Sequence, residues 1–488
     1  MSSSSTPALL CLSLALLGTL ALPVAPARAQ PVDEVIEQLV GQAETSNLEL
    51  AGTAAGVAQR LAVLDQARAR FLPSINLGLR YSRADGGRQI DLPVGDLLNP
   101  VYGSLNALLA ASGQPAPFTP IDNESIPFLR EREQQSAVSL TQPLYDARIG
   151  AAARAARFDY QASRQGLEAF RIRLRRDVQQ AYLRWLATRE SRGILEASLE
   201  AARENSRVND SLYRNGKVTR DLVLRAEADV LEIEQQIEST AGAERIARNY
   251  VNLLRNASLE APLPQATASD ADVARLRDSL ILKAGHAARD RGALQQAAVD
   301  RRYELKQIDS GLGAAGAAED VARAAFKPQL ALAVDTGIQG EDYGFGQDDR
   351  YVLASLVLRF NFYNGGADRA SLRQARARSD ELRATRDLAE QQIRLEVLEA
   401  LNDFEVAEAS LRTAAKRVEA AEGAFEIARR KRDLGQIPQV EFIDARRAVT
   451  SAQLNQRVNR FQALSALAAI EYAVGGAAPA GSATETGP

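Results

Sequence analysis

The sequence is almost without cysteine and histidine, and this scarcity excludes several kinds of site. One Cys, Cys11, and one His, His286, occur among 488 residues. A disulfide framework and a zinc site built from Cys and His are therefore excluded. A Ser-His-Asp triad could only use His286, which lies in a helical-looking run and is best interpreted as a surface histidine. Since no set of catalytic residues converges, we expect no enzyme, and we expect no cofactor or metal.

A strong net charge and a long apolar segment are also missing. The net charge is −3, which argues against a nucleic-acid-binding surface. Beyond the N-terminal region, no stretch of the sequence approaches the roughly 18 apolar residues of a membrane-spanning helix. If the protein spans a membrane, we therefore expect it to do so as a β-barrel.

Residues 1–29 are predicted to be an export signal peptide. An apolar run over about residues 8–24 precedes Ala27-Arg28-Ala29, which fits a cleavage site with small residues. Cys11 follows a leucine inside that run, where a lipoprotein signal needs a small residue, so lipidation is not expected. The mature chain then has no cysteine, which suits an oxidising periplasm.

The remaining chain has the pattern of an internal duplication. The stretch RFLPSINLGLRYSR at 70–83 has a near copy, AFKPQLALAVDTGIQ, at 325–339. Further on, turns containing Gly216 and Gly435 align at an offset of 435 − 216 = 219 residues. A long repeat indicates that one structural unit was copied and that the copies pack side by side. We expect a first repeat over 30–264, a second over 265–474 and a disordered tail over 475–488.

Both repeats are predicted to be mainly helical. Residues 365–434 contain no proline and would extend about 105 Å at 1.5 Å per residue. Apolar residues in this stretch recur at spacings of four and three, which is typical of a left-handed supercoil. The long helices are predicted at 31–70, 147–214, 218–256, 365–434 and 438–473, with two shorter helical segments within 270–325, at about 270–284 and 286–325.

Four stretches of alternating apolar and polar residues are predicted to be strands: 71–83, 134–145, 326–339 and 350–363. Segments of about ten residues with this alternation are typical of a transmembrane barrel, although a soluble antiparallel sheet with one wet face is an alternative. Four strands cannot close a barrel, so the chain must associate. Two copies would give eight strands, and three would give twelve strands and a pore.

The loops that join the strands in pairs, about 85–133 and 340–349, are expected to be extracellular. The first contains LLNPVYGSLNALLAASG, which we interpret as a short helix over the mouth of the barrel.

The order of these elements resembles the TolC-type outer-membrane efflux protein family over essentially the whole mature chain. Its most specific marks are the paired Phe-x-Pro strand starts, the LYDAR and FYNGG strand-to-helix junctions, and the paired Gly-containing turns. The resemblance implies a homotrimer with a 12-stranded β-barrel in the outer membrane and a 12-helix periplasmic tunnel. It also implies helices 270–325 in an equatorial belt, no catalysis, and a passive exit duct for an efflux pump or type I secretion system. An inner-membrane transporter would supply the energy through a periplasmic adaptor.

The resemblance also assigns roles to residues at the two turns. The residues that match adaptor-docking tips are Asn215, Gly216, Lys217, Val218, Leu434, Gly435, Gln436 and Ile437. The acidic residues that match a ring inside the periplasmic entrance are Glu441, Asp444 and Asp221. The alternative for these carboxylates is an ordinary solvated helix face. The family's Tyr and Arg lock is replaced here by Arg432 and Ile437, so another closure is expected.

A different class of protein, a periplasmic coiled-coil scaffold or adaptor without a pore, would also fit the long helices. A passive porin is disfavoured because porins lack helices of this length. The sequence does not determine the cargo, since the pump selects it.

Overall fold

The computed structural model describes residues 30–284, 290–342, 344 and 346–476. The predicted signal peptide with Cys11, the residue His286, and residues 477–488 of the predicted tail lie outside these residues. The chain forms two units, each built from separate stretches of sequence. Residues 30–47, 174–284 and 400–472 make up the first unit, and the remaining described residues make up the second.

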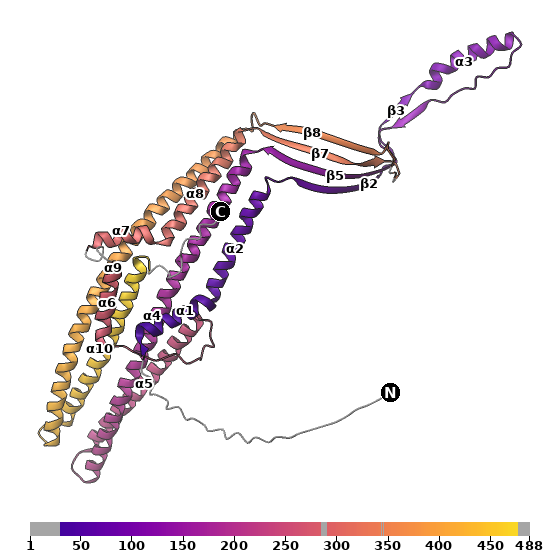
Figure 1. Cartoon of the computed structure of the whole chain (residues 1–488). Coiled ribbons are helices and arrows are strands. Elements are labelled where there is room, and N and C mark those ends of the chain that lie inside the picture. Colours follow the sequence, from indigo (N-terminus) through magenta and orange to yellow (C-terminus); the bar gives the residue numbers. More distant parts are fainter. Residues whose placement is uncertain (1–29, 285–289, 343, 345, 477–488) are drawn as a thin grey trace, which may run out of the picture. The chain divides into compact units, whose positions relative to one another are not determined.

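The first unit is helical. It contains α1 (Val32–Ser46), α5 (Arg220–Leu254), α6 (Asp270–Ala284), most of α10 (Gln439–Ala473), and the C-terminal parts of α4 (Ala147–Arg214) and α9 (Ala367–Asp433). Two short strands, β1 (Gln30–Pro31) and β6 (Ala266–Thr267), pair in parallel. The two hairpins α4–α5 and α9–α10 are visible in Figure 1.

The core of this unit follows the supercoil period that the sequence predicts. On α4 the residues at the equivalent spacing are buried: Val178, Ala181, Trp185, Leu195, Leu199 and Ala202. On α9 the same holds for Ala400, Phe404, Ala407, Leu411 and Ala414, in which large and small side chains alternate. Since the period of 3.5 residues keeps one face toward a neighbouring helix, a buried stripe of this length requires a long partner.

Tyr182 shows how the polar groups of this core are satisfied. Its side chain is fully buried beside Trp185, and its hydroxyl donates to the carbonyl of Pro264 at 2.8 Å. Burial raises the pKa of the Tyr182 hydroxyl well above its usual value, so it stays protonated and remains a donor.

The second unit contains a four-stranded antiparallel sheet in the order β2-β5-β7-β8 (Figure 1). Its strands are β2 (Ser74–Arg83), β5 (Arg132–Tyr145), β7 (Gln329–Gly340) and β8 (Arg350–Arg359). Besides the sheet, the unit includes α2 (Leu48–Ala69), α7 (Arg291–Arg301), α8 (Tyr303–Arg323) and the 3-10 turn η2 (Ala324–Phe326). In the part of the chain that the structure describes, no helix has both the length and the apolarity that crossing a bilayer requires.

The register of the sheet separates an apolar face from a polar one. Leu77 lies opposite Val138, which lies opposite Thr336, which lies opposite Val352. The neighbouring row of paired residues lies on the other face and contains Asn76, Ser139 and Asp335. There the Ser139 hydroxyl donates to the Asp335 carboxylate. Because side chains alternate along a strand, the alternation in each sequence stretch adds up to a two-faced sheet.

Several predicted element boundaries are wrong. The predicted helix 31–70 is two helices, because Asn47 has an extended backbone between α1 and α2. The predicted strand 71–83 begins only at Ser74, after Pro73, and the strand 326–339 begins only at Gln329, after Pro328. A proline has no N–H for a ladder, so each pairing starts after it.

Two further stretches differ from prediction. The strand 350–363 ends at Arg359, before the exposed aromatic residues Phe360, Phe362 and Tyr363. The helical stretch 270–325 contains three separate helices, and α7 gives way to α8 at the extended residue Arg302. The buried Arg302 guanidinium bonds Glu304 and Glu396, which holds that break in place.

The stretch 85–133 is more ordered than predicted. Besides the expected helix, α3 (Val94–Ala111), it contains the strands β3 (Gln89–Leu92) and β4 (Glu124–Pro127), which pair with each other. These two strands are only four residues long, which is too short for a clear alternation of apolar and polar residues.

The sheet offers a matched pair of glycines for a stability test. Gly78 and Gly337 flank Ala137 from opposite sides. A Cβ at Gly337 would lie 2.1 Å from the Ser136 carbonyl oxygen, whereas a Cβ at Gly78 would meet nothing nearer than 4.0 Å. We predict that Gly337→Ala lowers the free energy of unfolding by about 1–3 kcal/mol through overpacking. Gly78→Ala should leave the thermal unfolding midpoint of the detergent-solubilised protein nearly unchanged. Equal midpoints for the two variants would contradict the prediction.

Candidate functional site

The two helical turns that the sequence singled out have the same backbone geometry. Gly216 and Gly435 have φ of +65° and +68°, the left-handed conformation that glycine adopts without strain. The N–H of Lys217 donates to the Leu212 carbonyl at 2.8 Å, and the N–H of Gln436 donates to the Lys431 carbonyl at 2.8 Å. These bonds close the C-termini of α4 and α9 in a Schellman-type cap.

The predicted tip residues all lie in these two turns and are largely exposed. Asn215, Gly216, Lys217, Leu434, Gly435 and Gln436 are exposed, while Val218 and Ile437 are half-buried. Leu434 is the apolar exception, with 71% of its surface open. The pair of turns therefore presents polar groups together with an unpartnered leucine, a combination that suits a protein contact.

The predicted acidic residues lie just beyond the turns. Glu441 and Asp444 are exposed on α10, while Phe442 and Ile443 between them are buried. Asp221, in the first turn of α5, accepts from the Thr219 hydroxyl and lies 3.9 Å from Arg225. The structure thus places two carboxylates of one chain on one open face of α10, whereas Asp221 is partly neutralised.

Arg432, which the resemblance aligns with a tyrosine found in some members of the family, makes a cation–π contact. The Arg432 guanidinium lies 3.9 Å from the centre of the Phe442 ring, and Phe425 packs on that ring from 5.5 Å. Arg432 also pairs with Asp433 at 3.1 Å. These contacts tie the end of α9 to the start of α10, so Arg432 stabilises the second turn itself.

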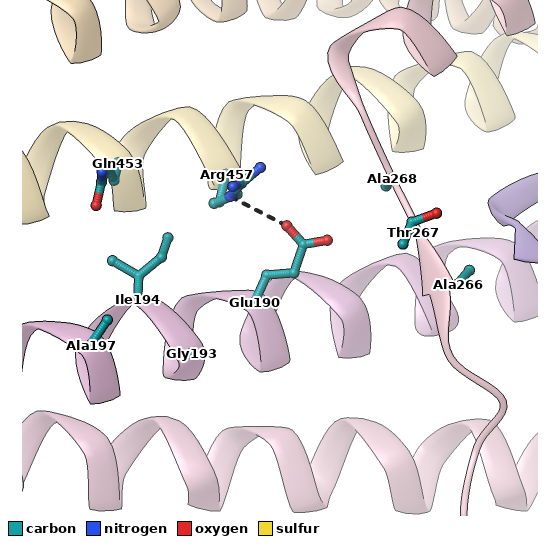
Figure 2. A pocket seen from close by; sticks show the side chains of 9 residues that line it. All are labelled: Glu190, Gly193, Ile194, Ala197, Ala266, Thr267, Ala268, Gln453 and Arg457. Carbon is teal, nitrogen blue, oxygen red and sulfur yellow. Dashed lines mark ion pairs between the residues drawn. The ribbon is translucent and has the colours of Figure 1, made fainter. Parts of the chain in front are cut away.

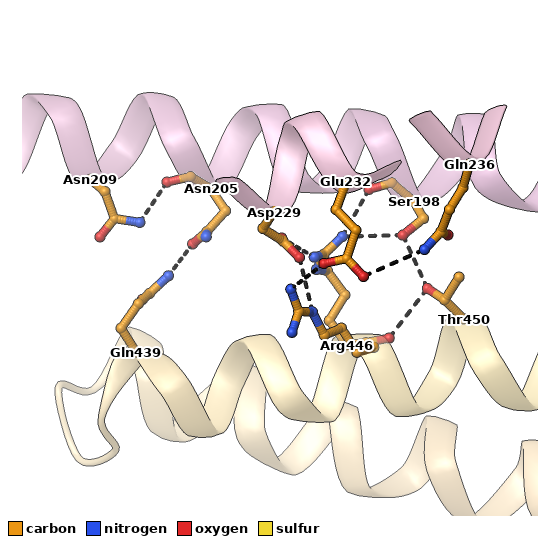
Figure 3. A network of polar contacts seen from close by, with 10 residues as sticks. Ser198, Asn205, Asn209, Asp229, Glu232, Gln236, Gln439, Arg446 and Thr450 are labelled. Atoms are coloured by element: carbon orange, nitrogen blue, oxygen red, sulfur yellow. Dashed lines mark hydrogen bonds and ion pairs between the residues drawn. The ribbon is translucent and has the colours of Figure 1, made fainter. Parts of the chain in front are cut away.

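A buried ion-pair network that the sequence did not indicate lies deeper in the same helices (Figure 3). Arg446 of α10 pairs with Asp229 of α5, and both side chains are almost fully buried. Arg447 pairs with Asp229 at 3.1 Å and with Glu232 at 2.8 Å. Burial lowers the pKa of the Arg446 guanidinium, and Asp229 opposes that shift.

Neutral groups extend this network to α4. Arg446 donates to the carbonyl and the hydroxyl of Ser198 at 3.0 and 3.1 Å, and Ser198 bonds the Thr450 hydroxyl at 3.0 Å. Nearer the turns, Gln439 of α10 donates to the side chain of Asn205 of α4 (Figure 3). The network therefore joins α10 to both helices of the first hairpin. No sequence period could show this, because the partners lie more than 200 residues apart.

A shallow hollow of about 520 Å³ lies between α4, β6 and α10 (Figure 2). Its walls carry mostly small side chains, and its charged residues Glu190 and Arg457 pair with each other at 3.4 Å. Burial raises the pKa of the Glu190 carboxyl, and Arg457 and Arg460 partly offset that rise. Among the described residues, no three His, Cys, Asp or Glu side chains gather as metal ligands would. A ligand in this hollow would thus meet mostly small side chains and two charged residues that already pair with each other.

The family model described as "Outer membrane efflux protein" matches residues 123–256 and 294–476, which together exceed half of the chain. The chain belongs to the outer membrane efflux protein family. This confirms the resemblance drawn from the strand starts and the helical turns. As an outer membrane efflux protein, the chain is a transport protein of the outer membrane.

Known proteins of this kind resemble the chain over most of its length. The pyoverdine export outer membrane protein OpmQ of Pseudomonas putida is 25% identical over 90% of this chain and 86% of its own length. A membrane protein from Pseudomonas aeruginosa has a similar fold, with a TM-score of 0.72, 20% identity, and coverage of 93% of this chain and 95% of its own. The CmeC outer membrane channel of Campylobacter jejuni has a TM-score of 0.72 at 15% identity, covering 93% of this chain and 90% of its own.

The buried network of this outer membrane efflux protein leads to a stability prediction. Asp229→Asn should lower the free energy of unfolding by about 3–5 kcal/mol, because it leaves the Arg446 charge buried without its counter-ion. The matched control is Asp210→Asn, which breaks the open pair with Arg214, whose side chains are 43% and 76% exposed. That change should cost less than about 1 kcal/mol. Urea unfolding followed by circular dichroism measures both, and equal losses would contradict the prediction.

Proposed function

We propose that the protein is the outer-membrane exit duct of a tripartite efflux pump or type I secretion system, working as a homotrimer. Three copies would form a 12-stranded β-barrel, four strands from each, continued by a 12-helix tunnel in the periplasm. The duct is passive, and an inner-membrane transporter drives cargo through it with the help of a periplasmic adaptor. The observation that carries the proposal is the two-faced sheet with its edge strands β2 and β8.

The apolar face of the sheet supports placement in lipid. On the edge strand β2, Ile75, Leu77 and Leu79 are each more than 65% exposed, and on β8 the same is true of Val352, Leu356 and Leu358. In water, a sheet with such a face would expose a larger apolar patch than ordinary soluble proteins do. Facing acyl chains, the same residues need no further partner.

The edge strands support association of copies. In hydrocarbon each unpaired backbone N–H or C=O costs several kcal/mol, so β2 of one copy needs a strand from another. Pairing β2 with β8 of the next copy around a closed ring satisfies both edges with one repeated interface. Two copies give an eight-stranded ring that side chains fill, whereas three give a ring wide enough for a pore. The trimer is therefore the smallest ring that conducts.

The proposed division of the chain is a signal peptide over 1–29, repeats over 30–264 and 265–474, and a tail over 475–488. The duplication is supported by the two turns, whose capping bonds recur at the offset of 219 residues. The bond from Gly216 to Tyr213 corresponds to that from Gly435 to Arg432, with lengths of 2.9 and 2.8 Å. Two tips per chain would give six tips in a trimer.

The turns are the proposed docking site of the periplasmic adaptor. The eight tip residues are accessible or partly so, and Leu434 supplies an apolar contact. The glycines at φ near +65° fix the shape of each tip, so a partner meets a preformed surface. The relative OpmQ is named for pyoverdine export, and a small exported compound of that kind is one cargo class for this duct.

Planar-bilayer recording combined with gel analysis tests the proposed function. The purified full chain in detergent should run as a band of about three times the chain mass without heating and as a monomer after boiling. The same sample should produce discrete single-channel steps in a lipid bilayer. A water-soluble monomer that gives no conductance would overturn the proposal and favour a periplasmic scaffold.

The carboxylates at the proposed entrance lead to a separate prediction. In the proposed trimer, three copies of Glu441 and Asp444 would put six carboxylates around the periplasmic entrance, which would favour cations. The double variant Glu441→Ala, Asp444→Ala should therefore weaken block of the single-channel current by a trivalent cation added on the periplasmic side. Glu238→Ala, an exposed acidic residue on α5 well away from the turns, serves as the control and should leave the block unchanged. Unchanged block in the double variant would refute the acidic ring and leave the channel proposal intact.

A further inference from the structure

The stretch between β2 and β5 carries an apolar surface that the proposed duct does not use. Residues 97–121 contain no charged residue, although they lie in a loop that is exposed throughout much of its length. This stretch includes most of α3 and the chain returning from it, which stand together at the end of the β3–β4 ladder (Figure 1). A water-facing loop of an exported protein would ordinarily carry charges.

One face of α3 bonds to and packs against the chain that returns from the helix. The Asn99 side chain accepts from the N–H of Ile121 and donates to its carbonyl, both at 2.8 Å. Asn106 does the same with Phe118, at 3.2 and 2.7 Å. The Phe118 ring also stacks on Tyr102, with ring centres 5.1 Å apart. These contacts give the hairpin a defined shape, since each asparagine satisfies both backbone groups of one residue on the returning chain.

A second face of α3 is exposed and has no partner among the residues that the structure describes. Leu97, Val101, Leu105 and Leu108 follow spacings of four, four and three, so they lie on one side of the helix. They are 69%, 52%, 40% and 69% exposed. We call these four residues the α3 stripe. A single exposed leucine is ordinary, but four in a continuous row on an uncharged helix mark a contact surface.

The hairpin is joined firmly to the sheet strand at which copies would meet. Beyond the last β2–β5 pair, the N–H of Ala84 donates to the Glu131 carbonyl at 3.0 Å, and the N–H of Phe128 donates to the Arg88 carbonyl at 2.8 Å. The β3–β4 ladder then carries the pairing on to α3. Since β2 is an edge strand, the hairpin of each copy would stand beside the junction with the next copy.

We propose that the α3 stripe packs against the α3 stripes of the other two copies and forms an apolar three-helix cap over the extracellular mouth. The inference rests on the proposed trimer. An uncharged apolar surface cannot form ion pairs with a charged partner, whereas three identical apolar surfaces can pack against one another around a three-fold axis. Each copy supplies the same face, so all three stripes are covered at once. The cap narrows the outer end of the duct, opposite the end that the adaptor engages.

Disulfide cross-linking in intact outer membranes tests this cap. The Cys11→Ser chain has no cysteine, which allows one cysteine to be introduced at a time. Leu108→Cys lies on the α3 stripe. Ala110→Cys, two residues on and therefore turned roughly 200° around the helix, is the matched control. Under a mild oxidant, most of the Leu108→Cys protein should form a reducible band of two linked copies, because only two of three thiols can pair. The control should stay unlinked.

Each outcome has a definite meaning. Cross-linking at Leu108 and at a second stripe position, Val101→Cys, with none at Ala110, supports the cap. A trimer band without cross-linking at either stripe position overturns the cap and leaves the proposed function standing. Quenching of a fluorophore at Leu108→Cys by brominated lipid, again without cross-linking, would overturn the cap in favour of lipid contact. Absence of any trimer in the unmodified chain refutes the proposed function itself, and the two failures are therefore distinguishable.

Discussion

The constraint on which the rest of the structure depends is that a sheet of four strands has two edges. Backbone groups at an edge need partners, and in the proposed membrane location the surrounding lipid would supply none. Once β2 and β8 are edge strands, another copy of the chain is the natural source of the missing pairs. The proposed closed ring would satisfy both edges, and it is consistent with the assignment as an outer membrane efflux protein.

The helical unit solves a different problem, because its helices are too long to fold back into a globule. Its packing combines a supercoil seam of alternating large and small residues with polar links between the hairpins. The pair of Arg446 and Asp229 is nearly inaccessible, and such a pair adds specificity of packing more surely than it adds stability. Its bonds reach α4, α5 and α10 together, so it fixes how the second hairpin lies against the first.

Glycine and asparagine shape the two helical turns and the α3 hairpin through local hydrogen bonds. At the two turns, a left-handed glycine lets the helix end and the next one begin within a few residues. At the α3 hairpin, Asn99 and Asn106 replace a missing backbone ladder by bonding both groups of Ile121 and Phe118. In both places short-range bonds create a rigid surface that side chains of another molecule can meet.

Local patterns in the sequence were enough to predict the long helices, the four principal strands and the family. They were enough because periods of 2 and 3.5 residues are local properties that follow directly from strand and helix geometry. Residues 147–214 illustrate this, since the predicted helix and α4 have the same limits. The sequence also placed the tip residues in turns, because Gly216 and Gly435 mark helix ends. The sequence did not predict the break between α1 and α2 at Asn47, since neither a glycine nor a proline marks that position.

The register of the sheet, the ion-pair network around Asp229, and the division of α3 into a bonded face and an exposed face became known only from the folded chain. These features join residues that are far apart in the chain or separated by an irregular return. In the sequence, Arg446 looks like any other helical arginine. Its partners Asp229 and Ser198 lie on other helices and contact it only in the folded chain. Nothing in a local pattern specifies which of many possible long-range partners it meets, so that choice belongs to the packing of the whole unit.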